Sequence, residues 1–369
     1  MTDGKKTFRA ILSSLKKISG AEHNGNQARH LNTLAGMICG IIRSKSVQLP
    51  QIAGKAPTTE GGYIDCPTTP ESQVKRFYRW IKNENVSHEV FFLPFAQHIL
   101  SALSHATLVL LIDGTVVGRD CMALVIAVVY KQRALPIAWL VEKKKKGHFK
   151  EEQHLELIQS VREMIPTGSR VVLLGDGEFD GVDLQSVINH WDWEYVLRTS
   201  ETNTLCWKDH WFAYKETIPH LKPGQIFVVP DALFTQRGYG PVMGLTWWRR
   251  DCKEPIHLVT NMECEEEACR FYGKRFKIET FFSDEKGRGF NLQKSHFSDP
   301  KRINRLLIAA FLAYYWIVAL GESTVREGWQ GVIHRKHRCD LSLFQLGLRL
   351  LNYLLEHDLH ITATFHMIC

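Results

Sequence analysis

A change of hydrophobic periodicity near residue 105 constrains the fold of this chain more than any other feature. Before it, apolar residues recur at helical spacing, as in Leu31–Ile42 and Val90–Leu103. After it, three β-rich runs follow one another across turn-sized gaps: Thr107–Ile112, Cys121–Tyr130 and Leu135–Val141. The pattern predicts a helical N-terminal region followed by an antiparallel meander.

Helices and strands alternate after the meander. A predicted helix at Glu151–Ile165 leads to an apolar strand at Val171–Leu174, and a helix at Val182–Trp191 leads to a strand at Tyr195–Arg198. A meander followed by strand, helix and strand indicates an α/β domain with a mixed sheet, whose parallel strands are buried on both faces.

Residues 201–262 return to short strand candidates broken by Gly and Pro, and helices resume at Glu265. We interpret this stretch as a β-rich insertion in the α/β domain, and Gln51–Pro70, rich in Gly and Pro, as a loop. The predicted organisation is a helical DNA-binding domain (1–105), a first core segment (106–200), the insertion (201–262), a second core segment (263–325) and a C-terminal helical segment (326–369). Within the last, the helix Leu341–His357 is a candidate dimer interface.

The positive charge of the chain is concentrated at its N-terminal end. The formal net charge is +7 over 369 residues, and residues 1–105 contain 13 Lys and Arg against 7 Asp and Glu. On the helix that begins at Pro70, Lys75, Arg79 and Lys82 fall within about 60° of one another at 100° per residue. Such a cluster suits DNA phosphates, although an ordinary solvated face explains it equally well.

Cysteine content and hydropathy bear on the location of the protein. Nine cysteines with irregular spacing do not form the disulfide framework of a small secreted domain, so we expect a reducing cytoplasm. The longest apolar run, Leu306–Leu320, has 15 residues and is short for a membrane span. We expect a buried core helix there and no membrane association.

Two apolar strands end at an Asp followed by Gly. They are Val109–Asp113 and Val171–Asp176. A carboxylate at the carboxyl end of a buried strand lies at the mouth of the sheet, where open α/β folds place ligands. Each Asp alone could simply open a turn, because Asp-Gly is a common turn dipeptide.

A third carboxylate lies in a predicted helix from Phe271 to Lys286. At 100° per residue Tyr272, Arg275, Glu279 and Lys286 share one stripe about 60° wide. Glu279 could ligate a metal ion while Arg275 and Lys286 bind phosphate oxygens. The alternative is a solvated face with an ion pair between Arg275 and Glu279.

These residues together resemble the DDE transposases of bacterial insertion sequences that carry a Tyr-Arg-Glu-Lys signature. The match consists of Asp113, Asp176 and Glu279, with Glu279 inside Tyr272-x2-Arg275-x3-Glu279-x6-Lys286, and it covers roughly residues 108–320. The resemblance implies a ribonuclease H-like catalytic core interrupted by a β-strand insertion between the second Asp and the Glu. One departure is visible, because Gly177-Glu178-Phe179-Asp180 stands where relatives often have Arg-Gly, which leaves open which carboxylate of that turn is the ligand.

The resemblance also implies a chemistry and partners. Asp113, Asp176 and Glu279 would hold Mg²⁺, with Mn²⁺ able to substitute, for cleavage and strand transfer of double-stranded DNA without a covalent protein intermediate. Tyr272, Arg275 and Lys286 would grip a DNA phosphate, and Trp247, Trp248 and Arg249 of the insertion supply a stacking plane and charge for a flipped base. One of these tryptophans could instead pack the core of the insertion. Two element ends must be joined, which implies a homodimer.

Two other functions remain open on the sequence. A catalytically silent protein could bind element ends as a regulator, and a metal-dependent nuclease could use the same fold on short substrates. The run Lys143–Lys146 could line a DNA channel, although four lysines after a strand usually form a solvated loop.

Overall fold

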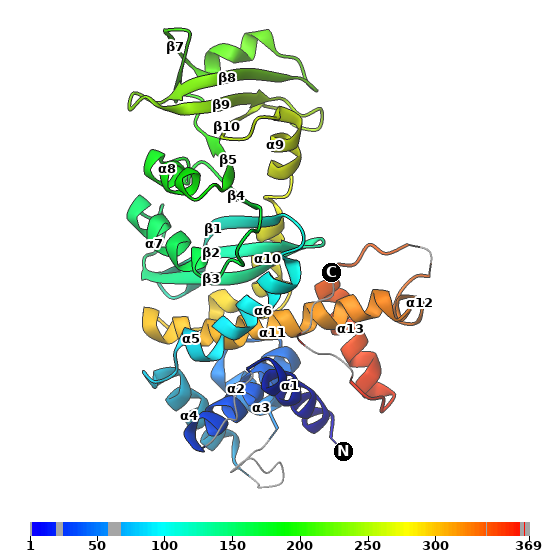
Figure 1. Ribbon diagram of the computed structural model, residues 1–369. Coiled ribbons are helices and arrows are strands. Elements are labelled where there is room, and N and C mark those ends of the chain that lie inside the picture. The colour runs from blue at the N-terminus through cyan, green and yellow to red at the C-terminus, as the bar shows by residue number, and fades with distance from the viewer. Residues whose placement is uncertain (1, 20–24, 58–67, 337, 362–364, 366–369) are drawn as a thin grey trace.

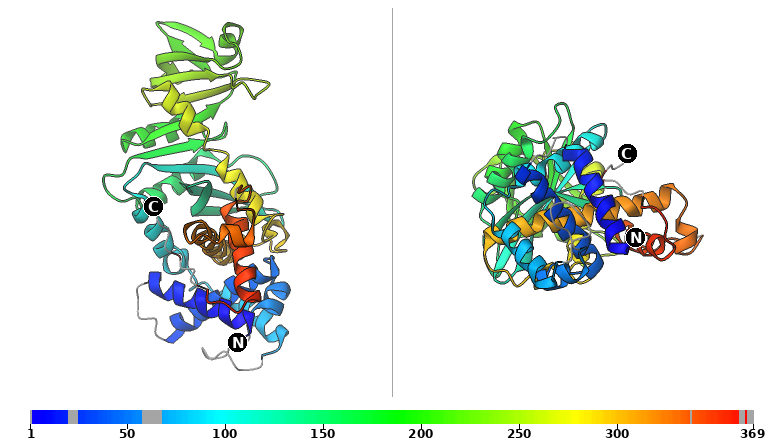
Figure 2. Two further views of the ribbon diagram at one scale, coloured as in Figure 1. Left: turned by 90° about the vertical axis from the view of Figure 1, so that its right-hand side faces the viewer. Right: turned by 90° about the horizontal axis from the view of Figure 1, so that it is seen from below.

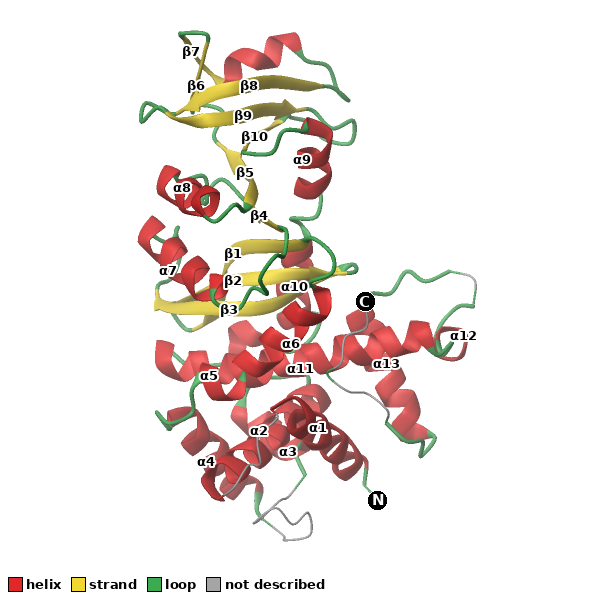
Figure 3. Ribbon diagram, viewed as in Figure 1, coloured by secondary structure: helices red, strands yellow, loops and turns green. Residues whose placement is uncertain are grey.

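The computed structural model describes residues 2–19, 25–57, 68–336, 338–361 and 365. The molecule is elongated, with helices gathered at the end that holds the N-terminus and a long stack of strands leading away from it (Figures 1 and 2). Colouring by secondary structure separates a helical end from a strand-rich end, with the meander strands between them (Figure 3).

All strands of the described residues belong to one sheet in the order β3-β2-β1-β4-β5-β10-β9-β8-β6-β7. The strands are β1 (Leu108–Gly118), β2 (Cys121–Tyr130), β3 (Arg133–Lys143), β4 (Val171–Gly175), β5 (Glu194–Thr199), β6 (Thr204–Trp207), β7 (His210–Ala213), β8 (Ile226–Phe234), β9 (Tyr239–Trp247) and β10 (Ile256–Thr260).

The first five strands form a mixed sheet in the order β3-β2-β1-β4-β5. β1, β2 and β3 pair antiparallel, as the predicted meander requires, whereas β4 pairs parallel with both β1 and β5. The parallel connections are made by α7 (Glu151–Arg162), between β3 and β4, and by α8 (Val182–His190), between β4 and β5. β4 is buried along its whole length, as expected for a parallel strand covered on both faces. The predicted fold class, a mixed α/β sheet with helices before and after it, is confirmed.

The β-rich stretch after residue 200 extends this sheet instead of forming a separate one. β10 pairs antiparallel with β5 on one side and with β9 on the other, so hydrogen bonds run without a break from the core into the insertion. The polypeptide then returns to the core through α9 (Glu265–Tyr272) and α10 (Lys277–Glu285). The short hairpin β6–β7 had no counterpart in the sequence analysis.

The helical end of the molecule is organised around one long helix, α11 (Pro300–Arg326), which lies between the sheet and the N-terminal helices (Figure 1). Pro300 suits its first turn, and the Asp299 side chain caps it by accepting from the backbone N–H groups of Lys301 and Arg302. The remaining helices are α1 (Asp3–Ser19), α2 (Gly25–Ser44), α3 (Leu49–Lys55), α4 (Pro70–Lys82), α5 (His88–Phe91), α6 (Leu93–Leu103), α12 (Gln330–Ile333) and α13 (Leu343–Glu356), with short 3₁₀ turns at Tyr214–His220 and Leu292–Lys294.

Within the described part of the chain, α11 is the one helix long and apolar enough to cross a membrane. Most of its apolar window is buried inside the protein, and Leu306–Leu320 is buried at every position. This agrees with the expected core helix.

Helices α11 and α13 approach each other closely at two glycines. A Cβ atom on Gly321 would lie 1.8 Å from the carbonyl oxygen of Leu343, and one on Gly347 would lie 2.0 Å from that of Ile317. The apolar face of α13 is therefore buried against its own chain, and this face is not open for the dimer contact that the sequence analysis considered.

Two local predictions were wrong. α3 occupies the first part of the predicted loop Gln51–Pro70, because its N1/N2 proline favours a helix start there; residues 58–67 lie outside the described residues. The predicted turn Gly114–Gly118 is strand, because β1 stays paired with β2 as far as Gly118.

Candidate active site

Strands β1 and β4 place Asp113 and Asp176 side by side. In their parallel ladder Leu111 is the partner of Leu174, and each Asp follows its leucine by two residues. The two carboxylates therefore reach the same level at the carboxyl edge of the parallel strands. Asp176 directly follows β4 as predicted, whereas Asp113 lies inside β1 and not at its end, because β2 continues to pair with β1 beyond it.

Each of these carboxylates accepts a backbone hydrogen bond from its own turn. Asp113 Oδ1 accepts from the N–H of Gly114 at 2.7 Å, and Asp176 Oδ1 accepts from the N–H of Glu178 at 3.0 Å. These bonds leave the second oxygen of each carboxylate available to other partners.

The third carboxylate, Glu279, is connected to the pair by Arg275, which lies between Glu279 and Asp113. Arg275 Nη2 lies 2.6 Å from Glu279 Oε1, and its Nη1 lies 3.7 Å from Asp113 Oδ2. The Arg275 side chain is 8% exposed and that of Glu279 is 52% exposed, so the guanidinium is buried between a buried and an open carboxylate. The ion pair of the alternative interpretation therefore exists, but Arg275 is buried and does not form part of a solvated face.

The predicted helix Phe271–Lys286 is not continuous. α9 ends at Tyr272, Gly273 caps it, and α10 begins at Lys277, so Arg275 lies in the turn between two helices. Gly273 itself is in the right-handed helical region (φ −57°), and the break comes from the turn that follows, in which the N–H groups of Lys274 and Arg275 donate to the carbonyl oxygens of Phe271 and Tyr272. Lys286 follows the last residue of α10 in a non-helical conformation. The single stripe predicted for these residues is therefore replaced by a bent path that still brings them together.

The electrostatics show that the carboxylates share one environment. The pKa of Asp113 is raised to about 7, mainly by burial and next by the negative charge of Asp176, and Glu279 acts in the same direction. The Gly114 N–H and the positive charge of Arg275 oppose this rise. Burial lowers the pKa of Lys286, while the nearby charge of Asp113 raises it, so Lys286 also belongs to the site.

Tyr272 is part of the site but is not open to solvent. It is 2% exposed, and burial raises the pKa of its phenol, against the lowering effects of Arg275 and Arg198. Arg198 was missed by the sequence analysis. It follows Leu197, which pairs with Gly175 directly before Asp176, so a strand ending in Arg beside one ending in Asp was the signal that could have revealed it.

The donor set suits a magnesium ion, although it does not form a closed cage. Within the described residues no three His, Cys, Asp or Glu side chains are grouped closely enough to hold a metal ion, and Glu279 accepts a hydrogen bond from Arg275 instead. Mg²⁺ is usually bound by one or two carboxylates together with waters and substrate phosphates. The paired Asp113 and Asp176, whose mutual repulsion raises the pKa of Asp113, fit that requirement.

The turn after Asp176 contains two other acidic residues, Glu178 and Asp180, and both form hydrogen bonds within the protein. The carboxylate of Glu178 accepts from the ring of His148 at 2.7 Å and from the N–H of Phe149. Asp180 Oδ2 accepts from Thr199 Oγ1 at 2.6 Å and from Asn203 Nδ2 at 2.9 Å. Both carboxylates are committed to protein donors, which favours Asp176 as the ligand of this turn.

The predicted tryptophan group lies at the end of β9 in the insertion. Trp247 and Trp248 are both half-buried, and the indole N–H of Trp248 donates to the carbonyl oxygen of Cys252 at 3.2 Å. Arg249 lies 5.6 Å from the ring centre of Trp247 and forms two hydrogen bonds with Asp251. Asp251 therefore offsets much of the charge that the sequence assigned to this group.

Three of the four cations of α4, those predicted to contact DNA, are exposed on one face, opposite the buried Phe77 and Trp80. α4 belongs to the helical end of the molecule, apart from the carboxyl edge of the sheet (Figure 1). Lys75, Arg79 and Lys82 therefore form a second basic surface and not part of the carboxylate site.

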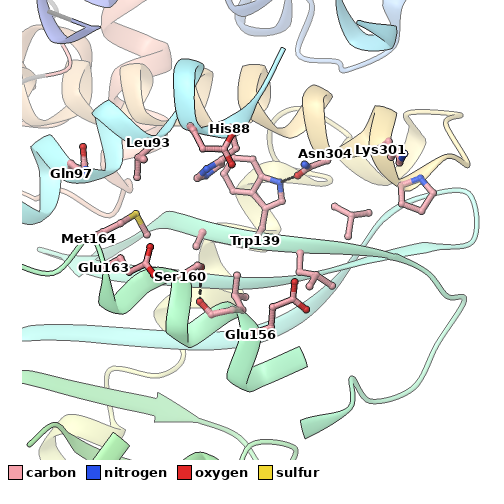
Figure 4. Close-up of a pocket in the computed structure, with 16 residues that line it drawn as sticks. His88, Leu93, Gln97, Trp139, Glu156, Ser160, Glu163, Met164, Lys301 and Asn304 are labelled. Carbon is pink, nitrogen blue, oxygen red and sulfur yellow. Dashed lines mark hydrogen bonds between the residues drawn. The ribbon is translucent and has the colours of Figure 1, made fainter. Parts of the chain in front are cut away.

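A cavity of about 590 Å³ lies elsewhere, between β3, α7 and the helices α5, α6 and α11. Trp139 forms its wall, with its indole directed to Asn304, and Glu156 and Lys301 lie at its margin (Figure 4). None of the predicted site residues lines it, so this cavity and the carboxylate site are separate features.

Neither a protein-family profile nor a curated protein sequence matches the chain. Among solved structures, a cryo-EM structure of the piggyBac transposase synaptic complex with hairpin DNA is 10% identical, with a TM-score of 0.44 over 98% of this chain and 81% of that chain. The catalytic domain of human endonuclease V is 17% identical, with a TM-score of 0.27 over 72% of this chain and 98% of that chain. The structural neighbours thus include a transposase and an endonuclease, and at these scores the functional assignment depends on the site itself.

Proposed function

We propose that the chain is a DNA transposase of the DDE type, similar to those of bacterial insertion sequences with the Tyr-Arg-Glu-Lys signature. One observation carries the proposal: Asp113 and Asp176 lie side by side on parallel strands, with Arg275 linking Asp113 to Glu279. Burial and the charge of Asp176 raise the pKa of Asp113 to about 7 even though Arg275 opposes the rise, so one guanidinium does not fully compensate these carboxylates and a further cation would.

We assign metal binding to the carboxylates of the site and phosphate binding to its cations. Asp113 and Asp176 would hold Mg²⁺, with Glu279 as the third ligand once Arg275 turns to a DNA phosphate. The bound metal would supply activation of a water or a 3′-hydroxyl and stabilisation of the leaving oxygen. Arg275 and Lys286 bind the phosphate group by charge, and the buried Tyr272 holds Arg275 in place. Joining of two element ends would require two copies of the chain.

The proposal is tested with DNA carrying the sequences that flank the gene. Purified protein is incubated with an end-labelled duplex of each flank in Mg²⁺, in Mn²⁺ or in EDTA, and nicking at the flank boundary is measured. We expect cleavage that requires the metal and the flanking sequence, and a loss of at least ~10³-fold in Asp113→Ala and Glu279→Ala proteins, as befits residues in direct contact with the reacting group.

Binding measured in EDTA separates the alternatives. Specific flank binding without nicking in either metal would indicate an end-binding regulator. Cleavage of short substrates without regard to flank sequence would indicate a nuclease. Unaltered cleavage in Glu279→Ala protein would refute the assignment.

A further inference from the structure

The segment that links β3 to α7, residues 144–149, carries Lys144, Lys145 and Lys146 and is called here the lysine loop. Its end is anchored beside Asp113. Phe149 is 4% exposed, and its ring lies against Gly114, where a Cβ atom would come within 3.2 Å of it. The loop therefore touches the residue that directly follows the first catalytic carboxylate.

Glu178 ties the same loop to the turn of the second carboxylate. Its carboxylate accepts from His148 Nδ1 at 2.7 Å and from the N–H of Phe149, and its own N–H donates to Asp176 Oδ1. His154 Nε2 lies 3.5 Å from the same carboxylate, whose side chain is only 12% exposed. One buried carboxylate thus links the lysine loop to the backbone around Asp176.

The lysines of the loop differ in the contacts that their side chains make. Lys144 Nζ donates to the carbonyl oxygen of His148 and lies 5.2 Å from the ring centre of Phe149, so it closes the loop on itself. Lys145 and Lys146 are exposed, and Lys145 Nζ is 3.9 Å from Asp120 Oδ1 with 79% of its side chain exposed. The charge of these two side chains faces solvent while the backbone beneath them is fixed.

We propose that the lysine loop binds the phosphate backbone of the DNA strand that enters the carboxylate site, and that Glu178 is the positioning residue that holds it there. Burial raises the pKa of the partly buried Glu178, but hydrogen bonds from His154, His148 and the Phe149 N–H lower it overall, so the fold stabilises the charged carboxylate that fixes the loop. This anchoring holds Lys145 and Lys146 beside both segments that carry the paired carboxylates. The identity of the ligand rests on the proposed function. The attachment of the lysine loop to Glu178, called here the clamp, does not.

The phosphate contact is tested by DNA binding without chemistry. A duplex of the flanking DNA is titrated in EDTA from about 50 to 200 mM salt with wild-type protein and with Lys145→Gln/Lys146→Gln protein. Removing one phosphate interaction reduces the slope of log Kobs against log[salt] by about 0.9, so we expect a slope smaller by ~1.8 and binding weaker by roughly tenfold at about 0.1 M salt. Lys336→Gln/Arg338→Gln is the charge-matched control, because both side chains are exposed in the segment between α12 and α13.

The clamp is tested on the protein alone. Limited trypsin digestion followed by mass spectrometry should show cleavage within the lysine loop several-fold faster in Glu178→Ala than in wild type. The control Glu163→Ala, an exposed glutamate after α7, should leave the rate unchanged. Glu178→Gln keeps an oxygen for the Phe149 N–H and should give an intermediate rate. In DNA binding, Glu178→Ala should reduce the salt slope by about 0.9, because the lysines remain but are no longer held in place.

The outcomes separate the two proposals. Equal salt slopes for wild type and the double lysine variant would overturn the phosphate contact, and equal trypsin rates for wild type and Glu178→Ala would overturn the clamp. Failure of the wild type to bind any flanking DNA would count against the proposed function itself, while the trypsin comparison would still decide the clamp.

Discussion

Replacement of Asp113 by Asn should stabilise the metal-free protein at neutral and alkaline pH. The fold raises the pKa of Asp113 from 3.8 to about 7, with burial as the largest cause and the charge of Asp176 as the second. At about 1.4 kcal/mol per pKa unit, ionising this group in the folded state costs up to about 4 kcal/mol. Asn has nearly the same shape and carries no charge, so Asp113→Asn removes that cost.

The sign of the pH dependence follows from proton binding. Because the folded state holds the Asp113 proton more tightly than the unfolded chain does, the stabilising contribution is complete below about pH 4 and is lost as pH rises through about 7. The free energies of unfolding of wild type and variant should therefore agree near pH ~4 and differ by at least ~2 kcal/mol at pH ~8. Asp284 and Glu285 also have raised pKa values, but they are common to both proteins and cancel in the difference.

The assay is urea denaturation in EDTA at pH 4, 6 and 8, repeated at pH 8 with Mg²⁺. A ligand at about ten times its Kd adds about 1.4 kcal/mol to the stability of the state that binds it, so Mg²⁺ should stabilise the wild type and not Asp113→Asn. If the two proteins lose stability in parallel between pH 4 and pH 8, Asp113 does not bear an uncompensated charge. The reasoning for a cation site would then be refuted.

Three further predictions follow from packing, burial and exposure. Gly321→Ala should lower the free energy of unfolding by at least ~2 kcal/mol, because its Cβ would overlap the carbonyl oxygen of Leu343. The helical control Gly54→Ala has nothing within 4 Å of its Cβ and should raise this free energy by up to ~1 kcal/mol. Urea denaturation of both variants tests the prediction. Glu285→Gln should change the free energy of unfolding by less than ~1 kcal/mol at pH 7. Burial raises the pKa of Glu285 well above its ordinary value, and neither carboxylate oxygen has a hydrogen-bond partner among the described residues. A loss above ~3 kcal/mol would mean that the charge is needed. Trp247→Ala should weaken binding of flank DNA with an unpaired terminal base by ~1–3 kcal/mol, as measured by fluorescence titration, and equal affinity for wild type and variant would exclude base stacking there.

The architecture could be predicted because its signals are local. Apolar runs such as Val171–Leu174 and turn-sized gaps give the order of strands and helices, and that order restricts the sheet to few arrangements. The sequence placed Asp113 and Asp176 at the mouth of one sheet, and the parallel pairing of β1 with β4 brings them to the same level, although Asp113 lies inside β1 and not at its end. The predictions that failed concern boundaries: residues 51–55 are helix, residues 114–118 are strand, and a turn at residues 273–276 divides a helix whose side-chain periodicity was otherwise regular.

The remaining features of the site could not be predicted because they depend on contacts between distant segments. The link between Glu178 and His148 joins residues 30 positions apart, and no spacing rule foretells it. The exposed hairpin of β6 and β7 was missed because its strands are only four residues long and carry little alternation.

The unbroken hydrogen-bonded ladder from β1 to β9 has a mechanical consequence. Strands joined edge to edge resist stretching along the ladder. The sheet therefore sets the distance from the carboxylate pair to the tryptophans of the insertion. On the proposed function, a duplex in contact with both points would be bound at a spacing that the sheet sets and not at one set by a linker.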